Sequence, residues 1–374
     1  MTPENKSARR IAIENLKPGM VLAMDLVDAD QNLVLKSGSV LDKENFNTIM
    51  LNSSQYVYVL EESISAVAER IGFLESVKDD MYPLSDIPVQ ERDSFRHFSI
   101  EFADKPMRLA KAFKQLVEGE PIGRDELYAI ADNLMDHLKT KNDIMIYVNH
   151  LKATGERLHV HSINVALLAN LFGIWVNYDR QSLEDLTVAA LLHDIGKTQL
   201  PTEIINKNTA DMDPDELAQM KKHPSLGYRI LDNANMPEEI KLAALSHHER
   251  MDGSGYPLGL KGEKISKFAK IIAVCDVYDT MTTEKFGSPP ICPFDAIKQF
   301  ERDGYGNFDT ETLLLFLQNI AYTYLNARVA LSDGSYGRVV FINSDNMSRP
   351  IIVTDDERVL DLRRHKELMI SALA

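Results

Sequence analysis

The sequence is poor in cysteine, in positive charge and in long apolar runs. Its two cysteines, Cys275 and Cys292, are too few for a disulfide framework and fit a reducing compartment. Its net charge of −15 disfavours a protein that coats nucleic acid, because that role needs clustered lysine and arginine. No apolar run approaches the roughly 18–20 residues that span a bilayer, and residues 1–16 do not resemble a signal peptide. We therefore expect a cytoplasmic protein that neither spans a membrane nor binds a nucleic acid polymer.

The hydrophobic pattern divides the 374 residues into four parts. Residues 1–62 alternate short apolar runs with turn residues, which predicts a small β-rich N-terminal domain. Residues 63–149 have mostly helical periodicity and form a helical connecting region, and residues 150–325 continue as helix after helix, which predicts a bundle. Residues 326–374 return to short β-type runs between turns and predict a short β-rich C-terminal appendage. The expected fold class is mainly α.

Seven of the ten histidines lie within residues 150–248, most of them at helix ends or beside acids. The expected positions are His161 opening one helix, His193 and Asp194 closing the next, His223 ending a third, His247 and His248 ending a fourth, and Asp276 within a fifth. Helices of a bundle can direct such side chains toward one point. Imidazole and carboxylate are the usual ligands of iron, manganese, zinc and nickel.

An adjacent histidine and aspartate would let the imidazole bind one ion while the carboxylate bridges to a second. Two ions roughly 3.5–4 Å apart can activate a water and hold both oxygens of an in-line displacement at phosphorus. Lys197 follows Asp194 by about one helical turn. It is positioned to neutralise a phosphate oxygen or to assist the leaving group.

Each histidine motif also has a structural explanation. Histidine followed by glycine is common at a helix C-terminus, and imidazoles are favoured near the negative end of a helix. A single buried histidine is more often a satisfied core group than a ligand. Capping does not explain why these motifs occur together with Asp194 and Asp276, so the sequence predicts a metal site. His150 and His159 have no partner in this scheme and are expected at the surface.

Four motifs in order, HDIGK (193–197), KHP (222–224), HHERMDGSGYP (247–257) and DVYD (276–279), resemble the signature of the HD-GYP family, a branch of the HD phosphohydrolases. The stretch 16–41 resembles the small N-terminal domain that often precedes such modules in the chain. The family hydrolyses cyclic di-GMP to linear pGpG and often on to GMP. The resemblance implies this phosphodiesterase activity, with diguanylate cyclase-type proteins as partners of the Gly-Tyr-Pro loop.

Carried over by position, the resemblance implies metal ligands, catalytic residues and a substrate loop. The metal ligands are His161, His193, Asp194, His223, His247, His248 and Asp276, with Asp194 bridging two divalent ions, iron or manganese. The catalytic residues are Asp194 and Lys197, and Lys197 contacts the scissile phosphate. The loop beside the pocket contains Arg250, Asp252, Gly253, Gly255, Tyr256 and Pro257, and its glycines would let the backbone approach the substrate closely.

The chain departs from the family pattern at two places. Some members have a glutamate four residues before the first histidine, which supports a third metal; this chain has Arg157 there, so we expect two metals. The family's basic stretch after DVYD is replaced by TTEKFGSPP, where Lys285 takes the first basic position and Ser288 the second. Lysine is a point charge where arginine binds phosphate or guanine with a fork. Two alternatives therefore stay open, a catalytically weak cyclic di-GMP receptor or partner-docking module and a phosphohydrolase for another nucleotide.

Overall fold

The chain consists of two compact units, Met1–Leu84 and Ser85–Ala374. The structure is a computed structural model that describes residues 8–12, 20–27, 33–41, 49, 56–60, 93–132, 134, 143–150, 157–283 and 290–373.

The described part of the first unit consists of short antiparallel strand pairs. Strand β1 (Ala8–Ala12) pairs with β4 (Tyr56–Leu60), and β2 (Leu26–Val27) pairs with β3 (Leu33–Leu35). The buried residues of this unit form one apolar cluster, made of Met20, Leu22, Leu41, Ile49, Val57 and Val59. Three of the β-type runs therefore lie on strands, while Val21 and Leu22 form isolated bridges with Val40 and Val59.

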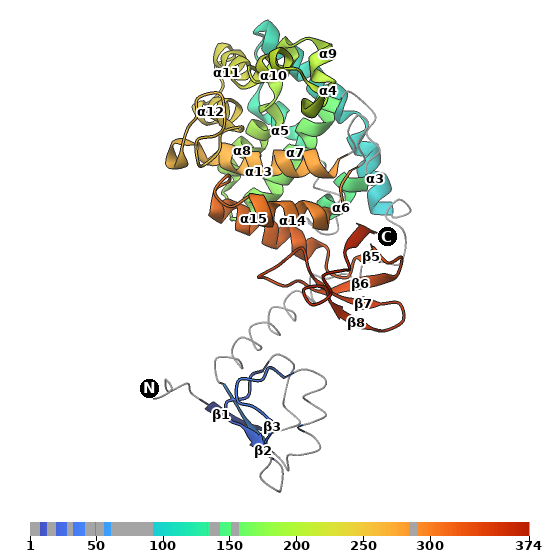
Figure 1. The fold of residues 1–374 in the computed structure, drawn as a ribbon. Helices are drawn as coiled ribbons and strands as arrows, with labels where there is room; N and C mark the ends of the chain where they lie inside the picture. The colour runs from blue at the N-terminus through green and yellow to red at the C-terminus, as the bar shows by residue number, and fades with distance from the viewer. Residues whose placement is uncertain are drawn as a thin grey trace. The chain divides into compact units, whose positions relative to one another are not determined.

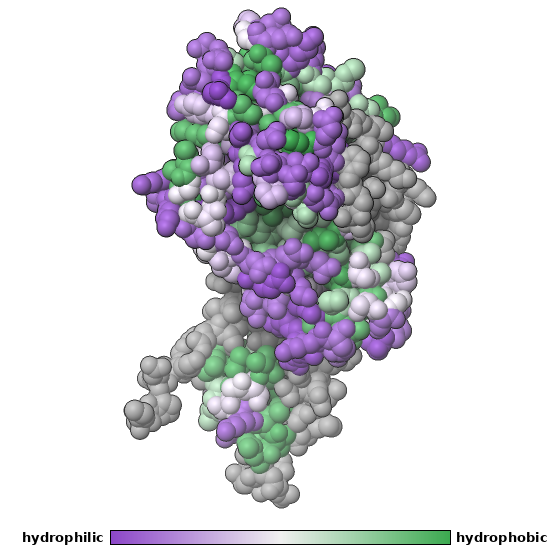
Figure 2. Space-filling model, turned by 45° about the horizontal axis from the view of Figure 1, so that its top comes forward, coloured by the Kyte–Doolittle hydropathy of each residue, from purple (hydrophilic) through white to green (hydrophobic). Residues whose placement is uncertain are grey.

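The second unit is a helical bundle followed by an antiparallel sheet (Figure 1). Its helices are α3 (Asp93–Phe102), α4 (Lys105–Glu118), α5 (Arg124–Asp132), α6 (Asp143–His150), α7 (Arg157–Trp175), α8 (Arg180–Leu192), α9 (Thr202–Ile205), α10 (Pro214–Met220), α11 (His223–Asn233), α12 (Glu238–Ser246), α13 (Lys267–Thr282), α14 (Pro293–Asp303) and α15 (Thr310–Thr323). Short 3-10 helices are η3 (Ile195–Gln199), η4 (Thr209–Asp211) and η5 (Gly262–Lys264). Hydrophilic side chains cover much of the face in Figure 2.

The C-terminal sheet has the strand order β8-β7-β6-β5-β9, and all its pairs are antiparallel. Its strands are β5 (Arg328–Leu331), β6 (Tyr336–Phe341), β7 (Ile351–Thr354), β8 (Val359–Asp361) and β9 (Ile370–Leu373). Glu301 of α14 fixes the loop before β7, because its carboxylate accepts hydrogen bonds from the Met347 N–H and the Ser348 hydroxyl, each at 2.6 Å. The mainly helical fold with a β-rich C-terminal end is thus confirmed.

Helix α7 is a buried element of the bundle that packs against α8 and α13. By length and apolar composition it meets the criterion for a membrane-spanning helix, so the expectation that no run reaches this length was too strict. However, 78% of that stretch is buried inside the protein. Because a helix that is apolar all round is also typical of a protein core, α7 is only weak support for a membrane segment.

The helices expected to form a connecting region pack onto the bundle. Helix α4 lies against α7 and α5 lies against α8. At the first of these contacts the ring of His159 lies 5.2 Å from the ring of Phe113, and both side chains are buried. The expectation that His159 is at the surface was therefore wrong, whereas the side chain of His150 lies outside the described residues. The domain boundaries at 149/150 and 325/326 stay predictions.

Candidate metal centre

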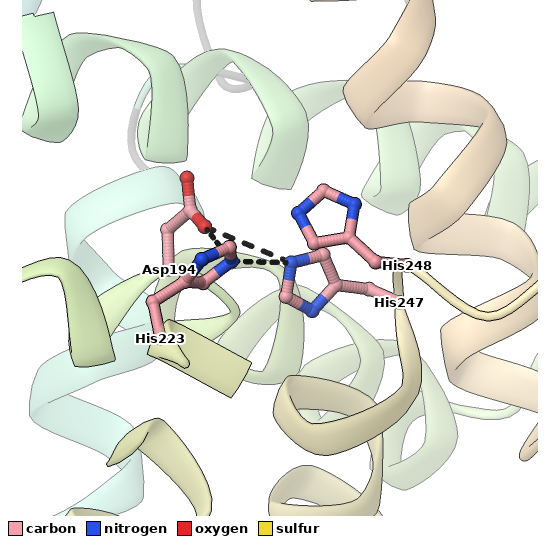
Figure 3. A group of neighbouring side chains, drawn as sticks. All are labelled: Asp194, His223, His247 and His248. Atoms are coloured by element: carbon pink, nitrogen blue, oxygen red, sulfur yellow. Dashed lines mark hydrogen bonds and ion pairs between the residues drawn. The ribbon is translucent and has the colours of Figure 1, made fainter. Parts of the chain in front are cut away.

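The structure brings all seven predicted ligands together from helices that are far apart in the sequence. His193 and Asp194 follow α8, His223 begins α11, His247 and His248 follow α12, and His161 and Asp276 lie within α7 and α13. The ligands fall into two groups, Asp194 with His223, His247 and His248, and His161 with His193 and Asp276. Within each group the potential ligand atoms all lie within 4.8 Å of one another. Figure 3 shows the first group, in which dashed lines join the Asp194 carboxylate to His223 and His247, and His248 lies beside His247.

Asp194 lies between the two groups and is almost fully buried. Its Oδ1 is 3.2 Å from Nε2 of His223 and 3.7 Å from Nε2 of His247. Its Oδ2 is 3.5 Å from Nε2 of His193 and 3.7 Å from Nε2 of His161. One oxygen therefore faces each group, which is the arrangement that a bridging carboxylate needs.

Asp276, which lies in α13, also spans the two groups. Its Oδ1 is 3.1 Å from Nε2 of His161, and its Oδ2 is 3.9 Å from Nδ1 of His248. Two carboxylates thus lie among the five imidazoles of the centre. Such a set of nitrogen and oxygen ligands suits first-row divalent ions.

Three of the imidazoles are held by the helix ends beside them. The Nδ1 atoms of His193, His223 and His247 lie 2.7, 2.7 and 2.9 Å from the carbonyl oxygens three residues earlier. The last carbonyls of a helix have no partner within the helix, so an imidazole N–H can satisfy them. Because Nδ1 then carries the proton, the Nε2 lone pair is directed at the centre, as in metal-binding histidines.

The contacts between these acceptors fit a bound cation. Nε2 of His223 lies 3.3 Å from Nε2 of His247, and neither can donate to the other while both Nδ1 atoms hold the proton. Among the described residues, the buried Nε2 of His193 and Oδ1 of Asp194 have no hydrogen-bond partner. Each buried polar group without a hydrogen bond lowers the free energy of unfolding by about 1–3 kcal/mol. Metal ions would coordinate these atoms, so the donor set fits the predicted metal site.

The environment keeps most of these groups in the protonation state that binds metal. Burial lowers the pKa of His193 to about 3 and also lowers the pKa of His223, so both imidazoles are neutral near pH 7. Burial by itself would raise the pKa of Asp194, but Lys197 and the imidazoles hold that pKa well below its usual value. Burial also opposes protonation of His161, but the two aspartates that contact it raise its pKa to about 10. A metal at His161 would therefore have to displace a proton.

Asp279 is part of the centre and was missed by the sequence reasoning. Its Oδ2 lies 2.7 Å from Nδ1 of His161, and its Oδ1 accepts hydrogen bonds at 2.9 Å from the Asn164 amide and the Thr283 hydroxyl. A carboxylate behind a ligating imidazole fixes the orientation of the ring. The available signal was the second aspartate of DVYD, which lies on the same helix face as Asp276 because the two are three residues apart.

We expect the Asp279→Asn variant to bind divalent metal about 10–100-fold more weakly, because the charge that orients His161 is lost. Titration of the metal-free protein with manganese, followed by calorimetry, measures the affinity. The same change at Asp303, which is exposed and pairs with its neighbour Arg302, is the control. Equal affinities of the two variants would show that Asp279 does not position His161.

His223 stands at a different place in its helix than expected. It begins α11 rather than ending a helix, because the proline that follows is favoured in the first turn. Its imidazole nevertheless reaches the end of α10, where it contacts the carbonyl oxygen of Met220. The short α10–α11 junction therefore places this side chain in the centre.

The Gly-Tyr-Pro loop follows His248 directly and is braced by its own residues. The carboxylate of Glu249 accepts hydrogen bonds from the N–H groups of Leu258 at 2.7 Å and Leu260 at 2.9 Å. A Cβ atom at Gly255 would lie 2.4–2.5 Å from the backbone of residues 248–250. The loop thus makes a close approach to itself at Gly255, while an approach of its backbone to a substrate stays a prediction.

Two more residues of the predicted substrate loop shape the turn at its tip. Gly253 has a φ of +83°, which favours glycine. Asp252 is exposed, and its Oδ1 accepts a hydrogen bond from the Ser254 N–H at 2.8 Å. These contacts give both residues a role in the fold of the loop.

The remaining predicted substrate residues differ in how they face the centre. The ring of Tyr256, which precedes Pro257, stacks on His248 with a centroid distance of 4.7 Å. Arg250 instead places its guanidinium over the ring of Phe308 at 4.8 Å and donates hydrogen bonds to the carbonyls of His247 and Glu249. These contacts of Arg250 hold the loop.

Lys197 pairs with Oδ2 of Asp194 and is partly exposed. It therefore lies at the centre, as predicted from its distance to Asp194 in the sequence. Lys285 and Ser288, the positions at which the family signature is altered, lie outside the described residues.

Comparison with known proteins shows what the part of the chain that carries this centre is similar to. Residues 134–311 match the HD domain family. The chain is 28% identical over 249 residues to the cyclic di-GMP phosphodiesterase PA4108 of Pseudomonas aeruginosa, which covers 66% of this chain and 60% of that protein. It is 31% identical over 204 residues to the cyclic di-GMP phosphodiesterase PdeB of Borreliella burgdorferi, which covers 54% of each. The chain thus spans less than two thirds of the length of these relatives.

Among solved structures, the HDG"Y"P protein Bd1817 of Bdellovibrio bacteriovorus matches with a TM-score of 0.49 and 17% identity. The match covers 83% of this chain and 99% of that chain. The resemblance drawn from the motifs is confirmed by the family match at the level of the HD domain.

Proposed function

We propose that this chain, whose residues 134–311 match the HD domain family, is a metal-dependent phosphodiesterase that hydrolyses cyclic di-GMP. The observation that carries the proposal is the meeting of five imidazoles and two carboxylates in two adjoining groups joined by Asp194. The relatives PA4108 and PdeB are both named cyclic di-GMP phosphodiesterases, which supports this substrate.

We further propose that the two groups hold two divalent ions, iron or manganese, with Asp194 as the shared ligand. Nitrogen and oxygen ligands suit either ion. When bound, such a pair would lower the pKa of a coordinated water and would stabilise negative charge at phosphorus. Arg157, at the start of α7, stands where a third-metal glutamate is found in some members of the HD-GYP family, which supports a count of two.

The residues around the centre have separate tasks in this reaction. Asp279 holds His161 in orientation, and Lys197 presents its ammonium beside Asp194, where a non-bridging oxygen of the scissile phosphate would be neutralised. The oxygen of water adds to phosphorus, and the P–O3′ bond breaks. The leaving O3′ takes up one proton that the attacking water has lost. The product is linear pGpG, and a second cycle at the remaining diester would give two GMP.

The first test is to purify the protein without oxygen, to count metals per chain, and to follow cyclic di-GMP by chromatography with iron or manganese supplied. We expect two metals and the appearance of pGpG or GMP. Two metals with cyclic di-GMP bound but intact would instead favour the receptor alternative.

The Lys197→Ala variant tests the role of the ammonium. We expect it to keep both metals and to lose turnover by about 10²–10³-fold, the usual effect of removing one group that stabilises transition-state charge. Lys267→Ala, an exposed lysine at the start of α13, is the control that should behave as the wild type. Loss of metal from Lys197→Ala would assign this residue to the stability of the centre and not to the substrate.

A second candidate substrate is 3′3′-cGAMP. Two relatives from Vibrio cholerae, each 32% identical over 166 and 125 residues, are named 3′3′-cGAMP-specific phosphodiesterases. The values of kcat/KM for the two cyclic dinucleotides, measured on one preparation, distinguish these substrates.

A further inference from the structure

Lys221 lies at the rim of the metal centre, and no carboxylate of the described residues pairs with it. It is the exposed residue that caps the end of α10, and its Nζ lies 5.4 Å from the centroid of the Tyr256 ring. That ring stacks on His248 and lies 6.4 Å from the ring of His223. Within the part of the chain that the structure describes, Lys221 takes part in no ion pair. The Tyr256 ring therefore lies between the Lys221 ammonium and the histidines.

The other cations near the centre are already engaged. Lys197 is paired with Asp194. Arg250 is directed at the Phe308 ring and at backbone carbonyls. Of these three described cations, Lys221 is thus the one that remains available to bind a ligand. Its backbone is fixed close to the centre, since it precedes His223 by two residues at the α10–α11 junction.

The proposed substrate has a need that this position meets. A cyclic dinucleotide carries two phosphodiesters, each with one negative charge, and only one of them can occupy the cleavage position beside Asp194 and Lys197. The second phosphate stays separated from the first by the sugars. A lysine has a long flexible stem and three donors, so its ammonium can leave the Tyr256 face and follow an anion nearby.

We propose that Lys221 binds the second phosphate of the cyclic dinucleotide and so selects substrates with two phosphates. This inference rests on the proposed phosphodiesterase function. Lys221 stands directly before the KHP motif, and it supplies a positive charge in addition to that of Lys197. Lys222, its neighbour, is also exposed but makes no contact with Tyr256 among the described residues, so it offers a matched comparison.

The test compares Lys221→Gln with Lys222→Gln on two substrates. Cyclic di-GMP has two phosphates, whereas bis(p-nitrophenyl) phosphate is a diester with one. For Lys221→Gln we expect KM for cyclic di-GMP to rise about tenfold, as on loss of one charge-assisted hydrogen bond. We expect kcat, metal content and KM for the one-phosphate diester to stay at wild-type values. Lys222→Gln should match the wild type on both substrates.

The possible failures are distinguishable. An unchanged KM for cyclic di-GMP in Lys221→Gln, with an active wild type, would overturn the inference alone. An equal rise of KM for both substrates would also overturn it, because the residue would then not respond to the second phosphate. A metal-loaded wild type that cleaves no cyclic dinucleotide would overturn the proposed function together with the inference.

Discussion

The Asp194→Ala variant is expected to lose both metals and to lose hydrolysis of cyclic di-GMP. Asp194 is the residue whose two oxygens face the two groups, at 3.2 Å from His223 and 3.5 Å from His193. No other described carboxylate of the centre lies between these two imidazoles. We expect the rate to fall at least about a thousandfold, since loss of a single charge-stabilising donor already costs on the order of 10²–10³-fold. Metal content by mass spectrometry and turnover by chromatography measure the two effects.

Two further variants separate this loss from unfolding. Asp194→Asn keeps the shape of the side chain but not its charge, so it should also lose metal while the circular dichroism of the helices stays as in the wild type. Asp125→Ala removes an exposed carboxylate from the first turn of α5 and should retain metal and activity. Wild-type activity in Asp194→Ala would show that the assigned centre is not the site of the reaction.

The Gly196→Ala variant is expected to disrupt the centre by a steric effect. A Cβ atom at this position would lie 1.9 Å from the carbonyl oxygen of His223 and 2.5 Å from the backbone nitrogen of Gly227. These are backbone atoms, which cannot swing aside as the end of a side chain can. Helices η3 and α11 would have to separate, and the contact of His223 with Asp194 would be lost with them. We expect the free energy of unfolding to fall by about 3 kcal/mol or more.

Thermal denaturation and metal content of Gly196→Ala check this prediction, and the same contact provides its control. A Cβ atom at Gly227 would meet its nearest neighbours at 3.4 Å and beyond, which is ordinary contact. Alanine is also favoured over glycine in a helix interior by roughly 1 kcal/mol. Gly227→Ala should therefore keep its metal and remain within about 1 kcal/mol of the wild type in stability. Equal destabilisation by the two substitutions would contradict the steric argument.

Local signals in the sequence explain much of the helical architecture. Helix α13 begins after Ser266, whose side chain accepts a hydrogen bond from the backbone of Ala269, and α8 begins after Asp179 in the same way. The ligand residues could be predicted because helix ends and the HD-GYP motifs mark them one by one. Their meeting in the structure agrees with that prediction, while their roles in catalysis stay a proposal.

Other features depend on distances that no local pattern contains. His159 is buried because α4 covers that side of α7, and periodicity within α7 does not reveal which helix lies there. The motif predicts that Arg250 contacts the substrate, but it does not reveal that this guanidinium lies over Phe308, more than fifty residues later. Such contacts are set by the packing of whole elements.

The sequence by itself determined which chemical groups this protein has and which local elements carry them. Composition, helix signals and four short motifs are properties of neighbouring residues, and they predicted the mainly helical fold and the seven candidate ligands. Only the tertiary structure decided that Asp279 orients His161, that Gly196 lies against the backbone of α11, and that Lys221 lies over Tyr256 beside His248. The physical reason is that these contacts join residues of different elements, whose separation depends on how close-packed side chains set the distance and angle between helices.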